Sequence, residues 1–98
     1  MPIGPGQSGH TFDYGTIISD APNQSGVYAI YSQHAWIYFG EGQDIRARLL
    51  AHLNGDNTCI TRCVPIGFQF ELWAAHQLVA RQDQLIARLG SLCNVRSG

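Results

Sequence analysis

Four side chains that together could act on a phosphate ester lie within 25 residues of one another. They are the phenols of Tyr28 and Tyr38, the guanidinium of Arg48 and the imidazole of His52. An arginine fork stabilises the charge on a phosphate under attack, and a histidine with a pKa of about 6.5 exchanges protons near neutral pH. A phenol ionises only near pH ~10, so a neighbouring cation must favour its charged form. The set suits attack on a phosphate and few other reactions.

Glycines mark both tyrosine segments, Gly26-Val27-Tyr28 and Tyr38-Phe39-Gly40. Arg48 follows the second tyrosine by ten residues, and His52 lies four residues further on. Over residues 25–94 this ordered set resembles the GIY-YIG nuclease superfamily. The resemblance implies metal-dependent hydrolysis of DNA phosphodiesters. It assigns catalysis to Tyr28, Tyr38, Arg48 and His52, and supporting or substrate-binding roles to Gly40, Arg46 and Asn94.

The position that the resemblance assigns to a metal ligand carries glutamine. Gln82 lies twelve residues before Asn94, where the family has a glutamate that binds one Mg²⁺ or Mn²⁺ ion. Hard cations prefer anionic oxygens, and glutamine retains a carbonyl oxygen without the charge. Asp83 is not expected to replace Gln82, because consecutive residues of a helix point about 100° apart. We therefore expect weak or absent metal binding and impaired catalysis in this chain.

Three explanations of Gln82 remain open. The chain could be a natural relative that lost catalysis and kept DNA binding, or it could carry a deliberate Glu→Gln change made to trap a substrate complex. Gln82 could also be an ordinary core glutamine with satisfied hydrogen bonds. The similar shape of the two side chains, in an otherwise intact motif, favours the deliberate change.

The two tyrosines are expected on adjacent strands of a hairpin. Residues 27–31 and 35–39 are rich in β-branched and aromatic side chains and flank the polar segment 32–34. A three-residue loop places Tyr28 directly opposite Tyr38, whereas a four-residue loop would place them on opposite faces of the sheet. We expect the three-residue loop, with Tyr28 opposite Tyr38 and Ile30 opposite Trp36.

Two helices and a third strand complete the expected domain. Asp44 is a good N-cap for a helix over residues 45–54, on which Arg48 and His52 lie one turn apart. Residues 67–73 alternate between apolar and polar side chains and predict a strand. A second helix is expected over residues 76–89, with Gln82 in the middle of an apolar face formed by Leu78, Val79, Leu85, Ile86 and Leu89. Residues 55–64 are expected to form a loop.

These elements predict an α/β (α+β) fold, a small three-stranded antiparallel sheet flanked by helices. We expect one domain over residues 25–98, preceded by a partly mobile N-terminal extension over residues 1–24 that is rich in glycine and proline at its start. Segment 11–18 could form a short strand or a helical turn. No run of eighteen apolar residues exists, so a membrane span is not expected.

Charge is low for a DNA-binding protein. The net charge is −1, and the six basic residues are all arginines within residues 46–98. Few phosphates can therefore be neutralised, which favours single-stranded DNA, held by base stacking on exposed aromatics, over duplex DNA. The odd number of cysteines, Cys59, Cys63 and Cys93, indicates reduced, buried thiols in a cytoplasmic protein.

Two other functions remain possible from the sequence. One is a non-catalytic module that binds nucleic acid or protein through the same cleft. The other is an interaction domain in which Trp36, Phe68 and Trp73 form a partner surface. The oligomeric state cannot be predicted from the residue pattern.

Overall fold

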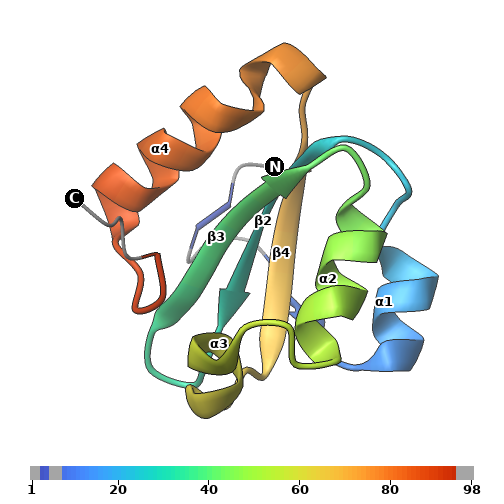
Figure 1. The fold of residues 1–98 in the computed structure, drawn as a ribbon, viewed down its shortest axis with the longest axis vertical. Helices are drawn as coiled ribbons and strands as arrows, with labels where there is room; N and C mark the ends of the chain where they lie inside the picture. The colour runs from blue at the N-terminus through green and yellow to red at the C-terminus, as the bar shows by residue number, and fades with distance from the viewer. Residues whose placement is uncertain (1–2, 5–7, 95–98) are drawn as a thin grey trace.

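The computed structural model describes residues 3–4 and 8–94. An antiparallel sheet with strand order β1-β4-β2-β3 forms its centre. Figure 1 shows α4 on one side of the sheet, and α1 and α2 on the other. In chain order the elements are β1 (His10–Thr11), α1 (Tyr14–Asp20), β2 (Gly26–Tyr31), β3 (Trp36–Gly42), α2 (Ile45–Leu53), α3 (Thr58–Arg62), β4 (Gly67–Leu72), the 3₁₀ turn η1 (Ala75–Gln77) and α4 (Leu78–Leu89).

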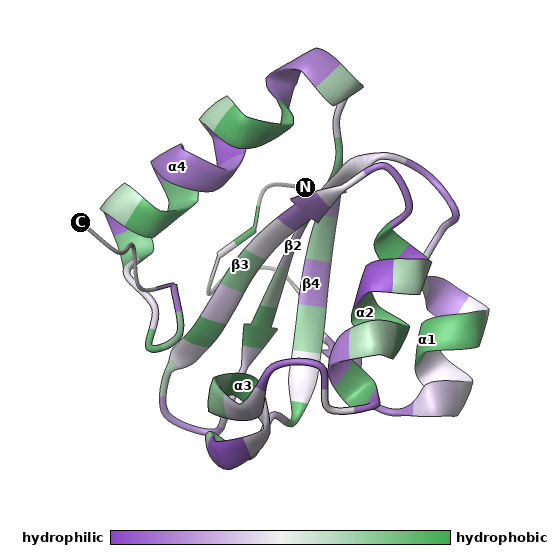
Figure 2. Ribbon diagram, viewed as in Figure 1, coloured by the Kyte–Doolittle hydropathy of each residue, from purple (hydrophilic) through white to green (hydrophobic). Residues whose placement is uncertain are grey.

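The sheet separates two hydrophobic cores. Alternate residues of the central strand β2 face opposite sides, so Tyr28 and Ile30 pack towards α1 and α2, whereas Val27 and Ala29 pack towards α4. Figure 2 shows both hydrophobic and hydrophilic residues along α2 and α4, as expected for helices that cover a sheet. The predicted α+β fold with a helix-flanked antiparallel sheet is confirmed. The short strand β1 is an addition to the three strands predicted.

The predicted register of the hairpin is wrong. Tyr28 pairs with Gly40, and Ile30 pairs with Tyr38, two residues away from the predicted register. The loop has four residues, 32–35, and a β-bulge follows Ile30. A four-residue loop alone would place the two tyrosines on opposite faces of the sheet. The extra residue in the bulge shifts the pairing by one, so both tyrosines stay on one face. Their ring centroids are 6.3 Å apart, on diagonally related positions.

Gly40 fits this register because it has no side chain. A Cβ atom at position 40 would lie 2.2 Å from both Cζ and Oη of Tyr28. Tyr28 is fully buried, so core residues surround its ring and oppose its displacement. The second glycine of the motif therefore gives the Tyr28 phenol room to lie across β3.

Segment 55–64 is not simply a loop, because α3 forms within it. The side chain of Asn57 caps α3 by accepting hydrogen bonds from the backbone N–H groups of Cys59 and Ile60. Ile60 is fully buried and fixes this short helix to the core. A five-residue helix is too short to show a hydrophobic repeat, which explains why its sequence resembles a loop.

The second predicted helix is confirmed, with a 3₁₀ first turn and Gly90 as its C-cap. Leu78 and Leu85 are buried, as predicted, but Val79 is 59% exposed and does not belong to the apolar face. No helix among the described residues is long and apolar enough to cross a membrane.

Residues assigned by sequence to an N-terminal extension take part in this fold. Strand β1 pairs with β4, and α1 lies beside α2 (Figure 1). The side chain of Ile3 is buried, and its backbone N–H donates to the carboxylate of Glu71. Arg81 of α4 also binds Glu71, through Nε and Nη2 at 2.8 Å each. The domain boundary at residue 25 stays a prediction.

Candidate active site

The hairpin and α2 bring three of the predicted catalytic side chains together. The hydroxyl of Tyr28 lies 2.6 Å from Nε2 of His52. The ring of Tyr38 lies 5.2 Å from the ring of His52, edge to face. Asp44 caps α2 as predicted, by accepting a hydrogen bond from the N–H of Ala47, and thereby fixes where the helix begins. The residue spacing within β2, β3 and α2 therefore creates the cluster.

A third residue, Asp56, extends the contact between Tyr28 and His52. Its Oδ1 lies 2.7 Å from Nδ1 of His52. Burial raises the pKa of Tyr28 above the usual 10.0, and a charge on Tyr38 would raise it further. The nearby Arg48 lowers the pKa and partly offsets these two effects. Burial also lowers the pKa of His52 below 6.5, although the hydrogen bond and charge of Asp56 oppose this.

These pKa shifts define the direction of each hydrogen bond at neutral pH. Tyr28 is protonated and donates its O–H to Nε2 of His52. His52 is neutral, carries its proton on Nδ1 and donates it to Asp56. Tyr28 and His52 are 0% and 3% exposed. The pair is therefore a buried relay in which neither side chain reaches solvent.

Arg48 lies beside this relay with its side chain exposed. A charge on Tyr28 would raise the pKa of Arg48 above its usual range, so the guanidinium remains protonated. Arg46, two residues earlier, donates from Nε to the backbone oxygen of Ala21 at 2.8 Å. That contact connects α2 to the end of α1 and gives Arg46 a structural role in this conformation.

A cavity of about 450 Å³ opens next to the cluster, between β3 and α4. Tyr38 and Gln82 both line it, so the structure brings the second tyrosine and the predicted metal position to one cavity. Tyr28, Arg48 and His52 do not line it. Its walls are Tyr38, Asn57, Val79, Gln82, Asp83, Ile86, Cys93 and Asn94.

Gln82 and Asn94 meet at one backbone group. Nε2 of Gln82 and Nδ2 of Asn94 both donate to the carbonyl oxygen of Phe39, at 3.1 and 2.8 Å. Oδ1 of Asn94 accepts from the N–H of Phe39 at 2.7 Å and from the hydroxyl of Ser91 at 2.5 Å. Asn94 thus holds the strand next to Gly40. The substrate-binding or supporting role assigned to Asn94 stays a prediction. The amide group of Gln82 must point its nitrogen at the Phe39 oxygen, because two oxygens would repel.

The cavity has a partial ligand set for a divalent cation. The oxygen-bearing side chains in its wall are those of Tyr38, Asn57, Gln82, Asp83 and Asn94, and Asp83 is the carboxylate among them. Mg²⁺ is often held in proteins by one or two carboxylates together with water and substrate oxygens. Asp83 lines the same cavity as Gln82. The expectation that Asp83 does not replace Gln82 as a metal ligand stays a prediction.

Sequence reasoning missed two of the side chains near this site. Asp56 follows His52 by four residues, a spacing that suggests contact on a helix, but it lies beyond the C-terminus of α2. Asn57 has no spacing relation to the motif and reaches the cavity because it caps α3. The partner surface proposed for Trp36, Phe68 and Trp73 is wrong, because Phe68 is fully buried and both tryptophans pack against the core beneath α4.

No known family profile matches this sequence. No curated protein is significantly similar to it either. Several solved structures are similar, and all three described here are of the GIY-YIG N-terminal endonuclease domain of UvrC from Thermotoga maritima. The magnesium-bound form is 20% identical, with a TM-score of 0.71 over 85% of this chain and 100% of that chain.

Two point mutants of that domain, each bound to its catalytic divalent cation, are similar to the same degree. A tyrosine-to-phenylalanine mutant is 21% identical, with a TM-score of 0.71. An asparagine-to-alanine mutant is 20% identical, with a TM-score of 0.72, and both matches cover 86% of this chain and 100% of theirs. The protein described here therefore has the fold of the GIY-YIG endonuclease domain.

Proposed function

We propose that this domain is an endonuclease that hydrolyses DNA phosphodiesters in the cytoplasm, with catalysis weakened by the neutral side chain of Gln82. The observation that carries the proposal is the buried Tyr28–His52 pair, which contacts the exposed carboxylate of Asp56 and lies next to a cavity that Tyr38 lines. Two buried titratable groups in contact are costly to desolvate, and in a fold shared with nucleases they are best explained by proton transfer.

The two tyrosines have different roles in this proposal. Tyr38 is half-buried and borders the cavity, so its hydroxyl is the one that orients or deprotonates the attacking water. Tyr28 has no exposed surface and passes protons to and from His52. Asp56 keeps the proton of neutral His52 on Nδ1, which leaves Nε2 as an acceptor. Arg48 binds the phosphate and stabilises its developing charge.

A divalent cation would be held at the α4 side of the cavity. The Oε1 atom of Gln82 and the carboxylate of Asp83 are the groups proposed to hold Mg²⁺ or Mn²⁺, with water and phosphate oxygens completing the shell. A bound cation would act as a Lewis acid on the phosphate. Because one carboxylate and a neutral amide bind weakly, we propose low affinity in this chain.

Single-stranded DNA is the proposed substrate. The net charge of −1 gives little long-range attraction to a duplex. A single strand can also lay a base against Tyr38, the aromatic side chain that lines the cavity. Tyr14 is 65% exposed, but it lies on α1 and not at the cavity. Base stacking at the cavity therefore depends on few aromatic side chains.

One assay tests the proposal. The present chain and Gln82→Glu are incubated with labelled single-stranded and duplex DNA in Mg²⁺ or Mn²⁺. We expect Gln82→Glu to cut, single strands faster than duplex, and the present chain to bind the same DNA with little cutting. A Gln82→Glu, Arg48→Ala double variant is the matched control and should be slow. If Gln82→Glu neither cuts nor binds DNA, the nuclease proposal fails.

The second candidate is a non-catalytic DNA-binding module. It is favoured by the hydrogen bond from Gln82 to Phe39, which gives the glutamine amide a structural use that a carboxylate cannot fill. Normal DNA binding by Gln82→Glu without cleavage would support this alternative.

A further inference from the structure

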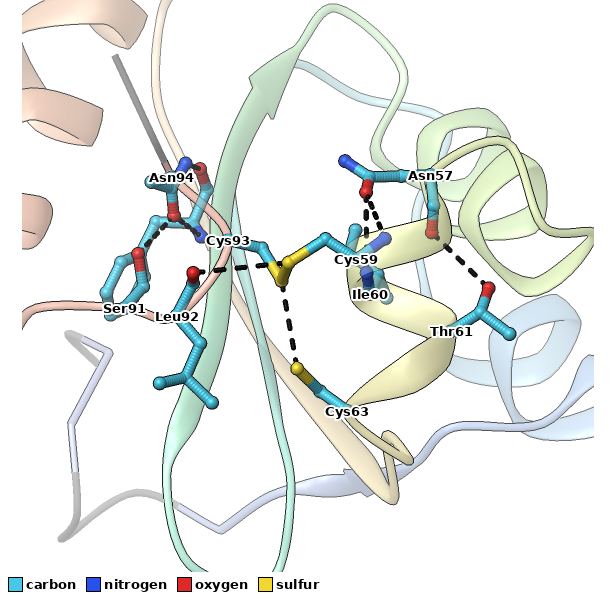
Figure 3. The surroundings of a disulfide bond; sticks show 10 residues. Asn57, Cys59, Ile60, Thr61, Cys63, Ser91, Leu92, Cys93 and Asn94 are labelled. Atoms are coloured by element: carbon cyan, nitrogen blue, oxygen red, sulfur yellow. Dashed lines mark hydrogen bonds between the residues drawn. A yellow bond between two sulfur atoms is a disulfide. The ribbon is translucent and has the colours of Figure 1, made fainter. Parts of the chain in front are cut away.

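Three cysteines from two distant parts of the chain meet at the edge of the candidate site. Cys59 and Cys93 form a disulfide, which corrects the prediction of three reduced thiols. Cys63, four residues after Cys59 and the C-cap of α3, has a free thiol. Its Sγ lies 3.8 Å from Sγ of Cys93, and all three sulfurs lie within 4.8 Å of one another. Figure 3 shows the Cys63 sulfur directed at the disulfide.

The disulfide joins the two walls of the candidate cavity. On one side, α3 begins at its cap Asn57, which lines the cavity. On the other side, Cys93 also lines the cavity and is followed by Asn94 (Figure 3). Asn94 binds both backbone groups of Phe39. Any change in this covalent link therefore acts on the segment that holds β3 next to Gly40.

We propose that Cys59, Cys63 and Cys93 form a thiol–disulfide exchange site. The thiolate of Cys63 attacks Sγ of Cys93, a new bond forms between these two sulfurs, and the bond from Cys93 to Cys59 breaks. Cys59 leaves as a thiolate and takes up the proton that Cys63 lost. One disulfide is lost and one is formed, so the exchange within the protein needs no external oxidant. Cellular thiols would open the 59–93 or the 63–93 disulfide, and small disulfides would re-form it.

The solvent exposure of the three cysteines differs in a way that suits thiol–disulfide exchange. Cys93 is 9% exposed, whereas Cys59 and Cys63 are both partly exposed. Cys93 is thus the shared inner sulfur, and the two outer sulfurs compete for it. Disulfides of cytoplasmic proteins are commonly transient and redox-responsive rather than permanent, which agrees with a third thiol beside the bond.

Exchange would move the covalent link along α3 by one helical turn. Sγ of Cys63 lies 3.8 Å from Sγ of Cys93, and an S–S bond is about 2 Å long, so forming the new bond would draw Cys93 and Asn94 by roughly 2 Å towards the C-terminal end of α3. This step changes the contact of Asn94 with Phe39. Its effect on cleavage rests on the proposed nuclease function, whereas the exchange itself does not.

The first experiment maps the disulfides. The full chain is equilibrated with reduced and oxidised glutathione, quenched in acid, alkylated and digested for mass spectrometry. We expect both the 59–93 and the 63–93 disulfide in the parent, only 59–93 in Cys63→Ser and only 63–93 in Cys59→Ser. Finding 59–93 alone in the parent, with two free thiols in Cys59→Ser, would overturn the proposal.

The reduced chain is then tested with Zn²⁺, because three thiolates are also ligands for a soft metal. We expect all three thiols to remain open to alkylation. One tightly held zinc per chain that protects all three would instead show a metal site and overturn the exchange proposal.

The last measurement addresses coupling to the candidate site. The backbone amide of Phe39 is compared by nuclear magnetic resonance in oxidised Cys63→Ser and oxidised Cys59→Ser. We expect different chemical shifts, and in the Gln82→Glu background a difference of about tenfold or more in cleavage rate. Identical Phe39 shifts would refute the coupling. Different shifts with no cleavage in either protein would refute the nuclease proposal alone.

Discussion

Replacing Gln82 by glutamate should make the stability of this domain depend on divalent cations. In the present chain Nε2 of Gln82 donates to the Phe39 oxygen, which also accepts from Asn94. A carboxylate cannot donate this bond and would face an oxygen. Because Asn94 still pairs with Phe39, we expect Gln82→Glu to lose about 1–2 kcal/mol of unfolding free energy without metal.

The melting temperature converts this loss into a measurable shift. A domain of 98 residues has an unfolding entropy of about 0.2 kcal/mol per degree, so the metal-free variant should melt roughly 5–10 °C below the parent. If the new carboxylate completes a site with Asp83, Mn²⁺ at a hundred times its dissociation constant adds about 2.7 kcal/mol. The melting temperature should then rise by roughly 13 °C.

Differential scanning calorimetry in EDTA and in Mn²⁺ provides the assay. The melting temperature of the parent should change little with Mn²⁺. Gln82→Leu should melt below the parent in EDTA, and Mn²⁺ should not restore its melting temperature. Gln82→Glu, Asp83→Asn should recover less than Gln82→Glu. Two results together would refute both the hydrogen-bond argument and the proposed location of the metal. They are a Gln82→Glu protein with the same melting temperature as the parent in EDTA, and no change in that temperature with Mn²⁺.

Three further predictions concern the relay and its neighbours. In the Gln82→Glu background, Arg48→Ala should lower the cleavage rate about 10²-fold, the scale of one charge stabiliser, and an unchanged rate in a single-turnover assay would contradict this. Gly40→Ala should cost about 1–3 kcal/mol or more by chemical denaturation, because the new methyl group overlaps the buried Tyr28 ring, and wild-type stability would show that the ring can move. Burial lowers the pKa of His52, so on acidification this side chain takes up a proton at a higher pH in the unfolded chain than in the folded chain. Stability should therefore fall as pH drops below about 6.5. In His52→Gln the melting temperature should lose this part of its pH dependence, and an identical profile would exclude His52 as the source.

Much of the candidate cluster could be predicted because local rules determine it. The distance between Arg48 and His52 is one helical turn, and Asp44 fixes where that helix begins. The two glycine-bracketed tyrosines lie on adjacent strands that a polar loop connects. Each of these relations spans few residues and depends on backbone geometry that the residue types specify directly.

The remaining features depend on contacts between distant segments. The β-bulge after Ile30 changes the pairing of Tyr28, and nothing in the loop sequence specifies it. The disulfide connects residues 34 positions apart, and their proximity arises only after α3 and α4 pack on the sheet. Val79 has the spacing of a core residue, yet α4 is rotated so that it borders the cavity. Such features result from tertiary packing, which local patterns do not contain.

The segment after α4 also determines how this domain avoids pairing with other chains. β3 lies at the edge of the sheet, and Leu92 and Cys93 donate backbone hydrogen bonds to Trp36 and Ile37. The opposite edge is β1, which has only two residues. A long, flat and apolar edge is a common starting point for aggregation. A shortened protein that ends at Gly90 would uncover the Trp-Ile-Tyr-Phe edge of β3 and should precipitate or form intermolecular sheets on concentration.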